Sequence, residues 1–110
     1  MKSRFVLVAA VLILLAAYPV VATAATASDG PALYKAKCAM CHGPDGSGQT
    51  PTGKSMKLRD LRSNEVQKQT DVELTKIISG GKGKMPPFGQ KLSNADVGAL
   101  IVHIRTLKGK

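Results

Sequence analysis

The first apolar stretch of the chain lies close to its start, where Lys2 and Arg4 precede a nearly continuous apolar run over residues 5–17. A basic start, a short apolar run and small residues that fit an A-x-A cleavage pattern are typical of a secretory signal peptide. We therefore expect a signal peptide over residues 1–24, cleaved between residues 24 and 27. The alternative is an uncleaved membrane anchor, because the apolar stretch over 5–21 just reaches the shortest length that spans a bilayer.

The apolar positions after residue 28 predict three helices. Asp29 followed by Pro31 has the form of a capped helix start and leads into residues 32–38. A capping box that begins at Thr70 precedes apolar residues at i, i+3 and i+4, and a pair of glycines ends this second helix. The third helix begins at Ser93, and its apolar face comprises Val97, Leu100, Ile101, Ile104 and Leu107.

The stretches between these helices lack a periodic apolar pattern. Residues 43–53 and 82–92 are rich in glycine, proline and polar residues, so both are predicted to be loops. Residues 54–69 fit either a loop or short helical turns. No strand-like alternation follows the signal, so the chain is predicted to be all-α with long loops. Such loops in a compact domain need a central group to wrap around.

The size and the net charge of the chain further limit its possible functions. Removal of residues 1–24 leaves a domain of about 86 residues, in which a hydrophobic core alone gives little stability. The whole chain carries 16 Lys and Arg against 7 Asp and Glu, and the excess stays positive without Lys2 and Arg4. A basic surface favours an acidic protein partner. Nucleic acid is a poor fit, because an exported chain rarely meets it and no aromatic platform is built for it.

The most specific motif of the sequence is Cys38-Ala39-Met40-Cys41-His42. At this C-x-x-C-H spacing two thiols can add to the two vinyl groups of a haem, and the histidine then lies under the iron. A disulfide of the thioredoxin type is one alternative, but it belongs at a strand-to-helix junction, and no strand is predicted. A zinc site would need His103 as a fourth ligand, and the set lacks the second paired spacing of a zinc finger.

The iron of such a haem needs a sixth ligand or an open position. Met85 is favoured, because the two prolines that follow it forbid regular helix and can hold the sulfur at a fixed height above a flat ring. Met56 is a weaker rival that could instead fill the core. His103 is expected to pack beside the apolar face of the third helix. Met40 lies between the two cysteines and cannot reach the opposite face of the ring.

On these residues the chain resembles a class I cytochrome c over nearly its whole mature length, residues 29–107. The resemblance implies a cytochrome c domain over residues 28–110, a small fold of three main helices whose loops wrap around one covalently bound haem c. It assigns the thioether bonds to Cys38 and Cys41. It assigns the proximal iron ligand to His42 and the distal one to Met85.

The resemblance extends beyond the haem ligands. Gly30, Tyr34 and Leu100 match the residues at which the first and last helices of the family cross. His103 is a departure, since the family usually has an aromatic residue there. Pro51 is placed like the loop proline whose carbonyl accepts the Nδ1 proton of the proximal histidine, and a plain turn proline is the alternative.

A second motif is rejected. Residues 48–55 spell G-x-x-x-x-G-K-S, the phosphate-binding loop of nucleotide-binding proteins. That loop needs a preceding buried strand and a following helix in an α/β domain. Here it follows the C-x-x-C-H motif in a short exported chain, so no nucleotide is expected.

Together these features predict a monomeric one-electron carrier in a bacterial periplasm. Its haem iron is expected to cycle between Fe(III) and Fe(II), and no enzymatic activity is expected. Methionine opposite histidine favours Fe(II), so a positive potential is expected. Four basic residues flank the loops at the expected haem crevice and either steer an acidic redox partner or are merely solvated: Lys54, Lys82, Lys84 and Lys91. The alternatives are a small haem enzyme, peroxidase-like or gas-binding, with an open sixth site, and a subunit docked permanently to a larger oxidase or dehydrogenase.

Overall fold

The computed structural model describes residues 18–22 and 28–110. Residues 18–22 form no helix or strand, and their side chains are exposed. The remainder of the predicted signal peptide and the predicted cleavage positions lie outside the described residues. Within the described part of the chain, no helix is both long enough and apolar enough to cross a membrane.

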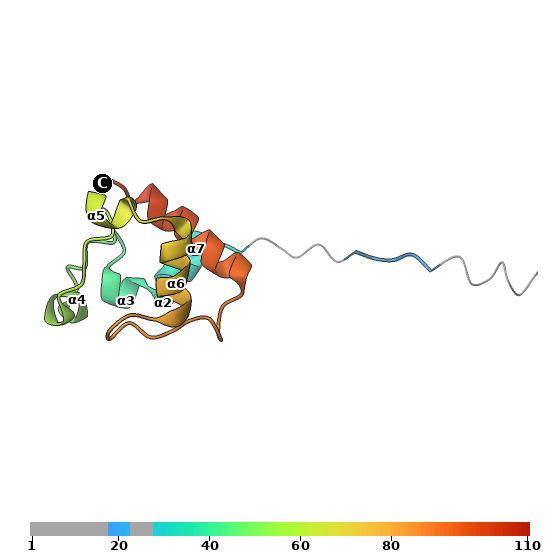
Figure 1. Ribbon diagram of the computed structural model, residues 1–110, viewed down its shortest axis with the longest axis horizontal. Helices are drawn as coiled ribbons and strands as arrows, with labels where there is room; N and C mark the ends of the chain where they lie inside the picture. The colour runs from blue at the N-terminus through green and yellow to red at the C-terminus, as the bar shows by residue number, and fades with distance from the viewer. Residues whose placement is uncertain (1–17, 23–27) are drawn as a thin grey trace, which may run out of the picture.

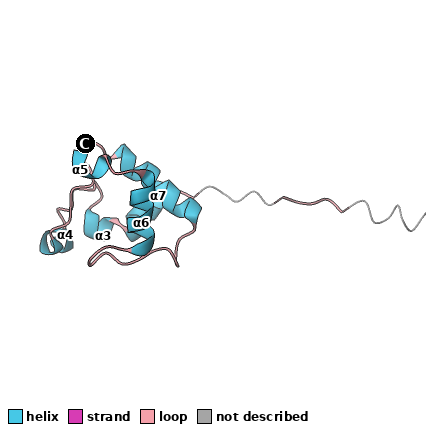
Figure 2. Ribbon diagram, in the orientation of Figure 1, coloured by secondary structure: helices cyan, strands magenta, loops and turns pink. Residues whose placement is uncertain are grey.

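Helices are the main secondary structure of residues 28–110, as Figures 1 and 2 show. In chain order they are α2 (Gly30–Lys37), α3 (Ala39–His42), α4 (Pro51–Met56), α5 (Asn64–Gln67), α6 (Asp71–Gly80) and α7 (Asn94–Thr106). The described residues contain no strand, only an isolated bridge between Lys82 and Met85. The predicted all-α fold with three main helices, here α2, α6 and α7, is confirmed.

Side-chain caps explain where the main helices begin. The carboxylate of Asp29 accepts a hydrogen bond from the N–H of Ala32 at the start of α2. Thr70 with Glu73, and Ser93 with Asp96, form complete capping boxes at the starts of α6 and α7. The helix starts predicted from the sequence are therefore those of the structure.

The hydrophobic core lies where α2 and α6 pack on α7. Its buried members are Tyr34, Val66, Leu74, Ile78, Val97, Leu100, Ile101, Ile104 and Leu107. The apolar face predicted for the third helix is thus buried in full. By contrast, α3 contains no buried residue, and α4 buries only Gly53. Within residues 39–62, Ala39 and Leu61 pack against this core, and the short helices α3 and α4 add little to it.

Helices α2 and α7 cross as the resemblance implied. A Cβ atom at Gly30 would overlap the backbone carbonyl of Ala99, so only glycine allows this approach. One turn later the ring of Tyr34 lies 4.7 Å from the ring of His103, with the two planes tilted by 49°. Leu100 is 1% exposed. His103 therefore fills the place of the usual aromatic residue with an imidazole ring.

The loop predicted over residues 43–53 is too long. Helix α4 already begins at Pro51, because the Thr50 hydroxyl accepts a hydrogen bond from the N–H of Gly53 and proline suits a first helical turn. Residues 54–69, which fitted either a loop or short turns, contain the end of α4, a left-handed turn at Lys57 and α5. Among the described residues no strand precedes residues 48–55, in keeping with the rejected nucleotide motif.

Candidate functional site

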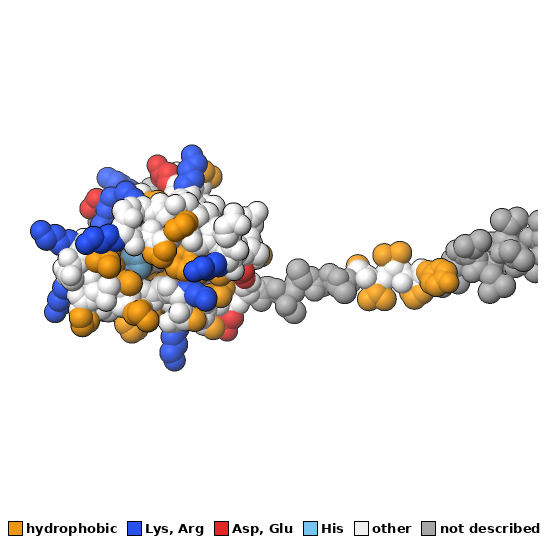
Figure 3. Space-filling model, turned by 90° about the horizontal axis from the view of Figure 1, so that it is seen from below, with side chains coloured by type: hydrophobic (Ala, Val, Ile, Leu, Met, Phe, Trp, Pro, Cys, Tyr) orange, Lys and Arg blue, Asp and Glu red, His pale blue; other side chains and the backbone are white. Residues whose placement is uncertain are grey.

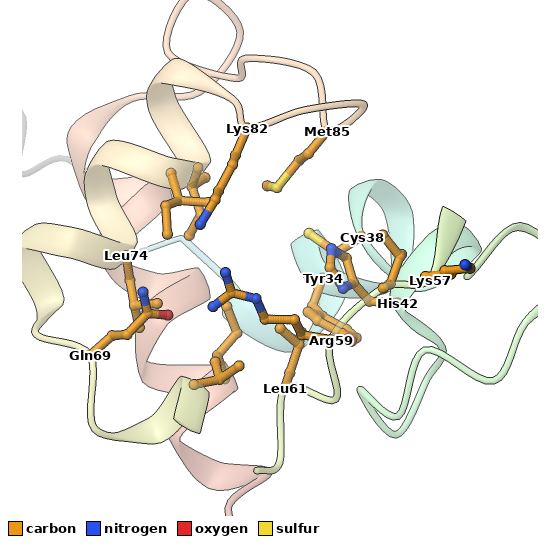
Figure 4. A pocket seen from close by; sticks show the side chains of 15 residues that line it. Tyr34, Cys38, His42, Lys57, Arg59, Leu61, Gln69, Leu74, Lys82 and Met85 are labelled. Atoms are coloured by element: carbon orange, nitrogen blue, oxygen red, sulfur yellow. The ribbon is translucent and has the colours of Figure 1, made fainter. Parts of the chain in front are cut away.

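A cavity of about 240 Å³ opens beside the core (Figure 4). Its wall includes α6, the end of α3 and the loops that follow α4 and α6. Seven of its fifteen lining residues are aliphatic, and these are Leu58, Leu61, Val66, Leu74, Ile77, Ile78 and Ile104. An apolar cavity of this kind suits a large apolar ligand that is held by a few placed polar groups.

Cys38 and His42 reach this cavity because α2 ends at Cys38 and the short helix α3 follows at once. Cys38 and Cys41 are both free thiols, so the disulfide alternative is not formed in this structure. No group of three or more His, Cys, Asp or Glu side chains among the described residues could hold a metal ion, which leaves the zinc alternative without a site.

The imidazole of His42 is partly buried, and its surroundings favour the neutral ring. Burial lowers its pKa, which favours the neutral ring with a free lone pair. Its Nδ1 atom is buried and has no hydrogen-bond partner among the described residues. A histidine that binds iron through Nε2 usually donates its Nδ1 proton to an acceptor, and the described residues do not provide that hydrogen bond.

The bond predicted from His42 Nδ1 to the Pro51 carbonyl is not formed in the structure. Pro51 is the first residue of α4, and this helix start is held by Thr50, whose hydroxyl donates to the Cys41 carbonyl at 2.7 Å. The approach of α4 is close, since a Cβ atom on Gly53 would lie 2.7 Å from that same carbonyl oxygen. A role for Pro51 beside the histidine stays a prediction.

The thiol of Cys38 is neutral in this environment. Burial, and then the neighbouring Cys41, raise its pKa to about 11. At neutral pH this wall of the cavity therefore carries no negative charge, and the sulfur that lines it can contact an apolar ring.

Met85 reaches the cavity from the loop after α6. Figure 4 shows its sulfur pointing into the cavity, with His42 on another side of it. The backbone of Met85 pairs with that of Lys82 through two hydrogen bonds of 3.0 and 3.2 Å. The N–H groups of Phe88 and Gly89 donate to the Ile78 and Ser79 carbonyls of α6, each at 3.0 Å. The sulfur is thus presented by a loop that is fixed at both ends.

The other candidates for a sixth ligand lie elsewhere. Met40 is 81% exposed and Met56 is 38% exposed, and neither lines the cavity. His103 packs on Tyr34 at the helix crossing and does not line the cavity either. Of the four residues considered from the sequence, Met85 is the one that the fold brings to the same cavity as His42.

Some residues of the site could not be predicted from any pattern in the sequence. Arg59 and Gln69 line the cavity from segments without apolar periodicity, and Lys57 does so as well. Of the four lysines expected at the crevice, Lys82 lines the cavity and the other three do not. The Tyr34 hydroxyl donates to the Gly43 carbonyl at 2.7 Å, directly after His42, a contact that a helix pattern cannot predict.

Comparisons with known proteins all find c-type cytochromes. A family profile described as "Cytochrome C oxidase, cbb3-type, subunit III" matches residues 25–104. Cytochrome c6 of Picosynechococcus sp. is 29% identical over 109 residues, which are 94% of this chain and 92% of that protein. Cytochrome c6 of Leptolyngbya boryana is 31% identical, over 73% of this chain and 91% of that protein.

Two further matches define the extent of the similarity. The cbb3-type cytochrome c oxidase subunit FixP of Azorhizobium caulinodans is 34% identical over 76% of this chain, but the match spans only 28% of that subunit. The solved structure of the KustC0563 c-type cytochrome superposes with a TM-score of 0.69 at 35% identity. It covers 74% of this chain and 99% of that one.

These matches confirm the predicted cytochrome c fold and its cofactor, one covalent haem c, and identify a c-type cytochrome that carries electrons. The cavity fits that cofactor through its aliphatic side chains, the free thiol of Cys38 and the neutral imidazole of His42. The chain therefore belongs to the cytochrome c family that the cbb3-type subunit III profile describes.

Proposed function

We propose that the chain is a periplasmic one-electron carrier that exchanges electrons with larger redox proteins of a respiratory or photosynthetic chain. Cys38 and Cys41 form the thioether bonds, His42 is the proximal iron ligand and Met85 the distal one. Haem c, once bound, supplies the Fe(III)/Fe(II) couple.

The observation that carries this proposal is the meeting of His42 and Met85 in one apolar cavity. His42 is part of the helical turn that also contains both cysteines, whereas Met85 comes from a loop fixed to α6 by backbone hydrogen bonds. A methionine opposite a histidine leaves no open position for a substrate, which favours electron transfer over an enzyme that binds peroxide or a gas.

The protein's contribution is to exclude water and to hold the ligands in place. Leu74, Ile78 and Ile104 line the cavity and belong to the core, so the iron would lie beside packed aliphatic side chains. A dry site of low dielectric raises the cost of the extra charge on Fe(III). Such a site therefore raises the reduction potential, in the same direction as methionine ligation.

The surface charge supports an acidic partner. Each ion pair of the described residues uses an arginine, namely Arg59 with Glu65, Arg62 with Asp45 and Asp60, and Arg105 with Asp71. No lysine in the described part of the chain forms one, so the lysine charges face solvent. Figure 3 shows Lys and Arg side chains around exposed hydrophobic ones on one face. Such a surface steers an acidic redox partner into a short-lived complex.

The start of the chain supports a periplasmic location. The basic and apolar pattern of residues 1–24 is that of a signal peptide, and residues 28–110 form the haem domain. Export places both cysteines where haem c is attached in bacteria, and we propose that the mature protein acts there as a monomer.

Carbon monoxide binding tests the proposal against an open-site enzyme. The holoprotein is reduced and exposed to carbon monoxide, and its visible spectrum is followed with time. A closed His42/Met85 pair predicts no rapid adduct in the wild type and a rapid adduct in Met85→Ala. The same rapid adduct in both proteins would contradict the proposal. Met56→Ala is the matched control and is expected to behave as wild type.

A further inference from the structure

One guanidinium connects the last turn of α7 to the segment around the end of α5. Arg105 donates to the Gln67 carbonyl at 2.8 Å and to the Gln69 carbonyl at 2.6 Å. It also donates to the Asp71 carboxylate, at 2.8 Å from Nη2 and at 3.3 Å from Nε. The guanidinium thus binds three residues that lie 34 to 38 positions earlier in the chain.

A second side chain adds to this connection. The side-chain nitrogen of Gln67 donates to the Leu61 carbonyl at 2.7 Å and to the Ile104 carbonyl at 3.0 Å. It therefore joins the segment before α5 to the residue that precedes Arg105 in α7, and Figure 1 shows α5 beside this end of α7. We call these hydrogen bonds of Arg105 and Gln67 the α5 clasp.

The segment that the α5 clasp holds forms part of the cavity wall but has little apolar anchoring of its own. Leu61 and Val66 line the cavity from this segment. Val66 is the one residue of the fully described helix α5 that is buried, and Leu61 is only partly buried against the core. By contrast, α2 and α6 pack directly on α7. The position of this wall therefore depends on the polar contacts of the clasp.

The shape of the guanidinium matters here as well as its charge. Hydrogen bonds from a charged donor are stronger than neutral ones, and the Arg105 side chain is only 29% exposed, which shields them in part from water. A planar fork of five N–H donors can serve three acceptors at once, whereas the ammonium of lysine is a compact point charge. Lysine at this position would keep the charge and lose most of the clasp.

We propose that Arg105 is a positioning residue of the redox site, which holds the wall formed by Leu61 and Val66 closed and so keeps the reduction potential high. This inference rests on the proposed haem attachment and iron ligands. Without the clasp the wall can move away from α7 and admit water. A higher local dielectric stabilises Fe(III), which carries one more positive charge than Fe(II). The potential then falls although neither the iron ligands nor the net charge has changed.

The test compares Arg105→Lys with Arg62→Lys in the holoprotein. Both changes conserve the charge, and both arginine side chains are 29% exposed. The hydrogen bonds of the Arg62 side chain go to Asp60, two residues away, and its contact with Asp45 is 3.8 Å long. Arg62→Lys therefore disturbs a local turn and leaves the clasp intact. Asp71→Asn is a milder variant that keeps both carbonyl contacts of Arg105, and it serves if Arg105→Lys does not fold.

Two quantities are measured in each protein, namely the midpoint potential and the amide hydrogen exchange of the clasped segment. Arg105→Lys is expected to lower the potential. It should also speed exchange of the Lys68 and Gln69 amides, which donate within the segment at 3.0 and 3.1 Å, by about tenfold or more. Exchange in α2 should stay as in the wild type. Asp71→Asn should change both quantities in the same direction by less, and Arg62→Lys should leave both unchanged.

Faster exchange with an unchanged potential would overturn the inference, because the clasp would then serve stability alone. Equal acceleration in α2 would also overturn it, since the whole fold and not this wall would have loosened. A potential shift in Arg62→Lys as large as that in Arg105→Lys would do the same. Failure of the proposed iron ligands is distinguishable from all three results, because it would appear as rapid carbon monoxide binding by the wild type.

Discussion

Gly30 of α2 lies so close to the backbone carbonyl of Ala99 in α7 that no side chain fits between the two helices. The contact sets the distance at which Tyr34, one turn further on, can pack its ring on His103 and reach the cavity. A small residue at the crossing thus positions part of the haem wall.

Gly30→Ala is expected to destabilise the holoprotein by about 1–3 kcal/mol, because one helix must move to admit the methyl group. Gly98→Ala is the matched control in α7, where a Cβ atom would meet nothing within 4 Å. Gly98→Ala should raise the free energy of unfolding by about 0.5–1 kcal/mol, because alanine has a higher helix propensity than glycine. Chemical denaturation followed by far-UV circular dichroism measures both, and a Gly30→Ala protein as stable as the wild type would show that the crossing can widen freely.

Tyr34→Phe is expected to cost about 0.5–1.5 kcal/mol, since it removes the hydrogen bond to the Gly43 carbonyl. The lower end is favoured, because the N–H of Gly46 also donates to that carbonyl. Burial raises the pKa of Tyr34, so the hydroxyl stays protonated and keeps this bond at neutral pH. Equal denaturation midpoints for the wild type and Tyr34→Phe would show that this bond adds nothing to stability.

Gly81→Ala is expected to weaken the Met85 loop. Gly81 has φ +75°, and a Cβ atom there would lie 2.7 Å from the Met85 carbonyl oxygen. Gly83 has φ +57° with nothing near its Cβ position, so Gly83→Ala should cost only the backbone strain of about 1–2 kcal/mol. The readout is the temperature at which the iron–methionine absorption is lost, which should fall further for Gly81→Ala. Equal losses would mean that the contact with the Met85 backbone relaxes without effect.

Acid should destabilise the fold. The pKa values of Asp60, Glu73 and Asp96 are held below their ordinary values by the Arg62 side chain, the Thr70 N–H and the Ser28 hydroxyl respectively. A carboxylate with a lowered folded pKa stabilises the protein above its unfolded pKa, and this contribution is lost as the pH falls. The free energy of unfolding should therefore decrease below about pH 4.5. Asp96→Asn should make that decrease shallower, and an unchanged slope would contradict the role of Asp96.

The sequence predicted those parts of the fold that depend on interactions between residues close together in the chain. Caps at Asp29, Thr70 and Ser93 mark the three helix starts, and the period of α7 identifies its buried face. Helix α4 was missed because Pro51 and Gly53 look like loop residues. The structure needs Gly53 for a close approach to the Cys41 carbonyl, which no local pattern reveals.

Some residues of the candidate site could likewise be predicted from the sequence, and others could not. The C-x-x-C-H motif and the Met85 loop could be predicted from the sequence, because residue type and spacing alone indicate their chemistry. The fold then brings Cys38, His42 and Met85 to one cavity. Arg59 and Gln69 could not be predicted, because their place depends on how the segments after α4 and α5 pack. The partnerless Nδ1 of His42 likewise follows only from tertiary structure.

The visible spectrum of the ferric holoprotein shows whether Met85 binds the iron opposite His42, through the weak charge-transfer band that iron–methionine bonding produces. We expect a low-spin spectrum with this band in the wild type, loss of the band in Met85→Ala and its retention in Met56→Ala. A high-spin ferric spectrum in the wild type, or a band that survives in Met85→Ala, would contradict a carrier in which His42 and Met85 hold the iron.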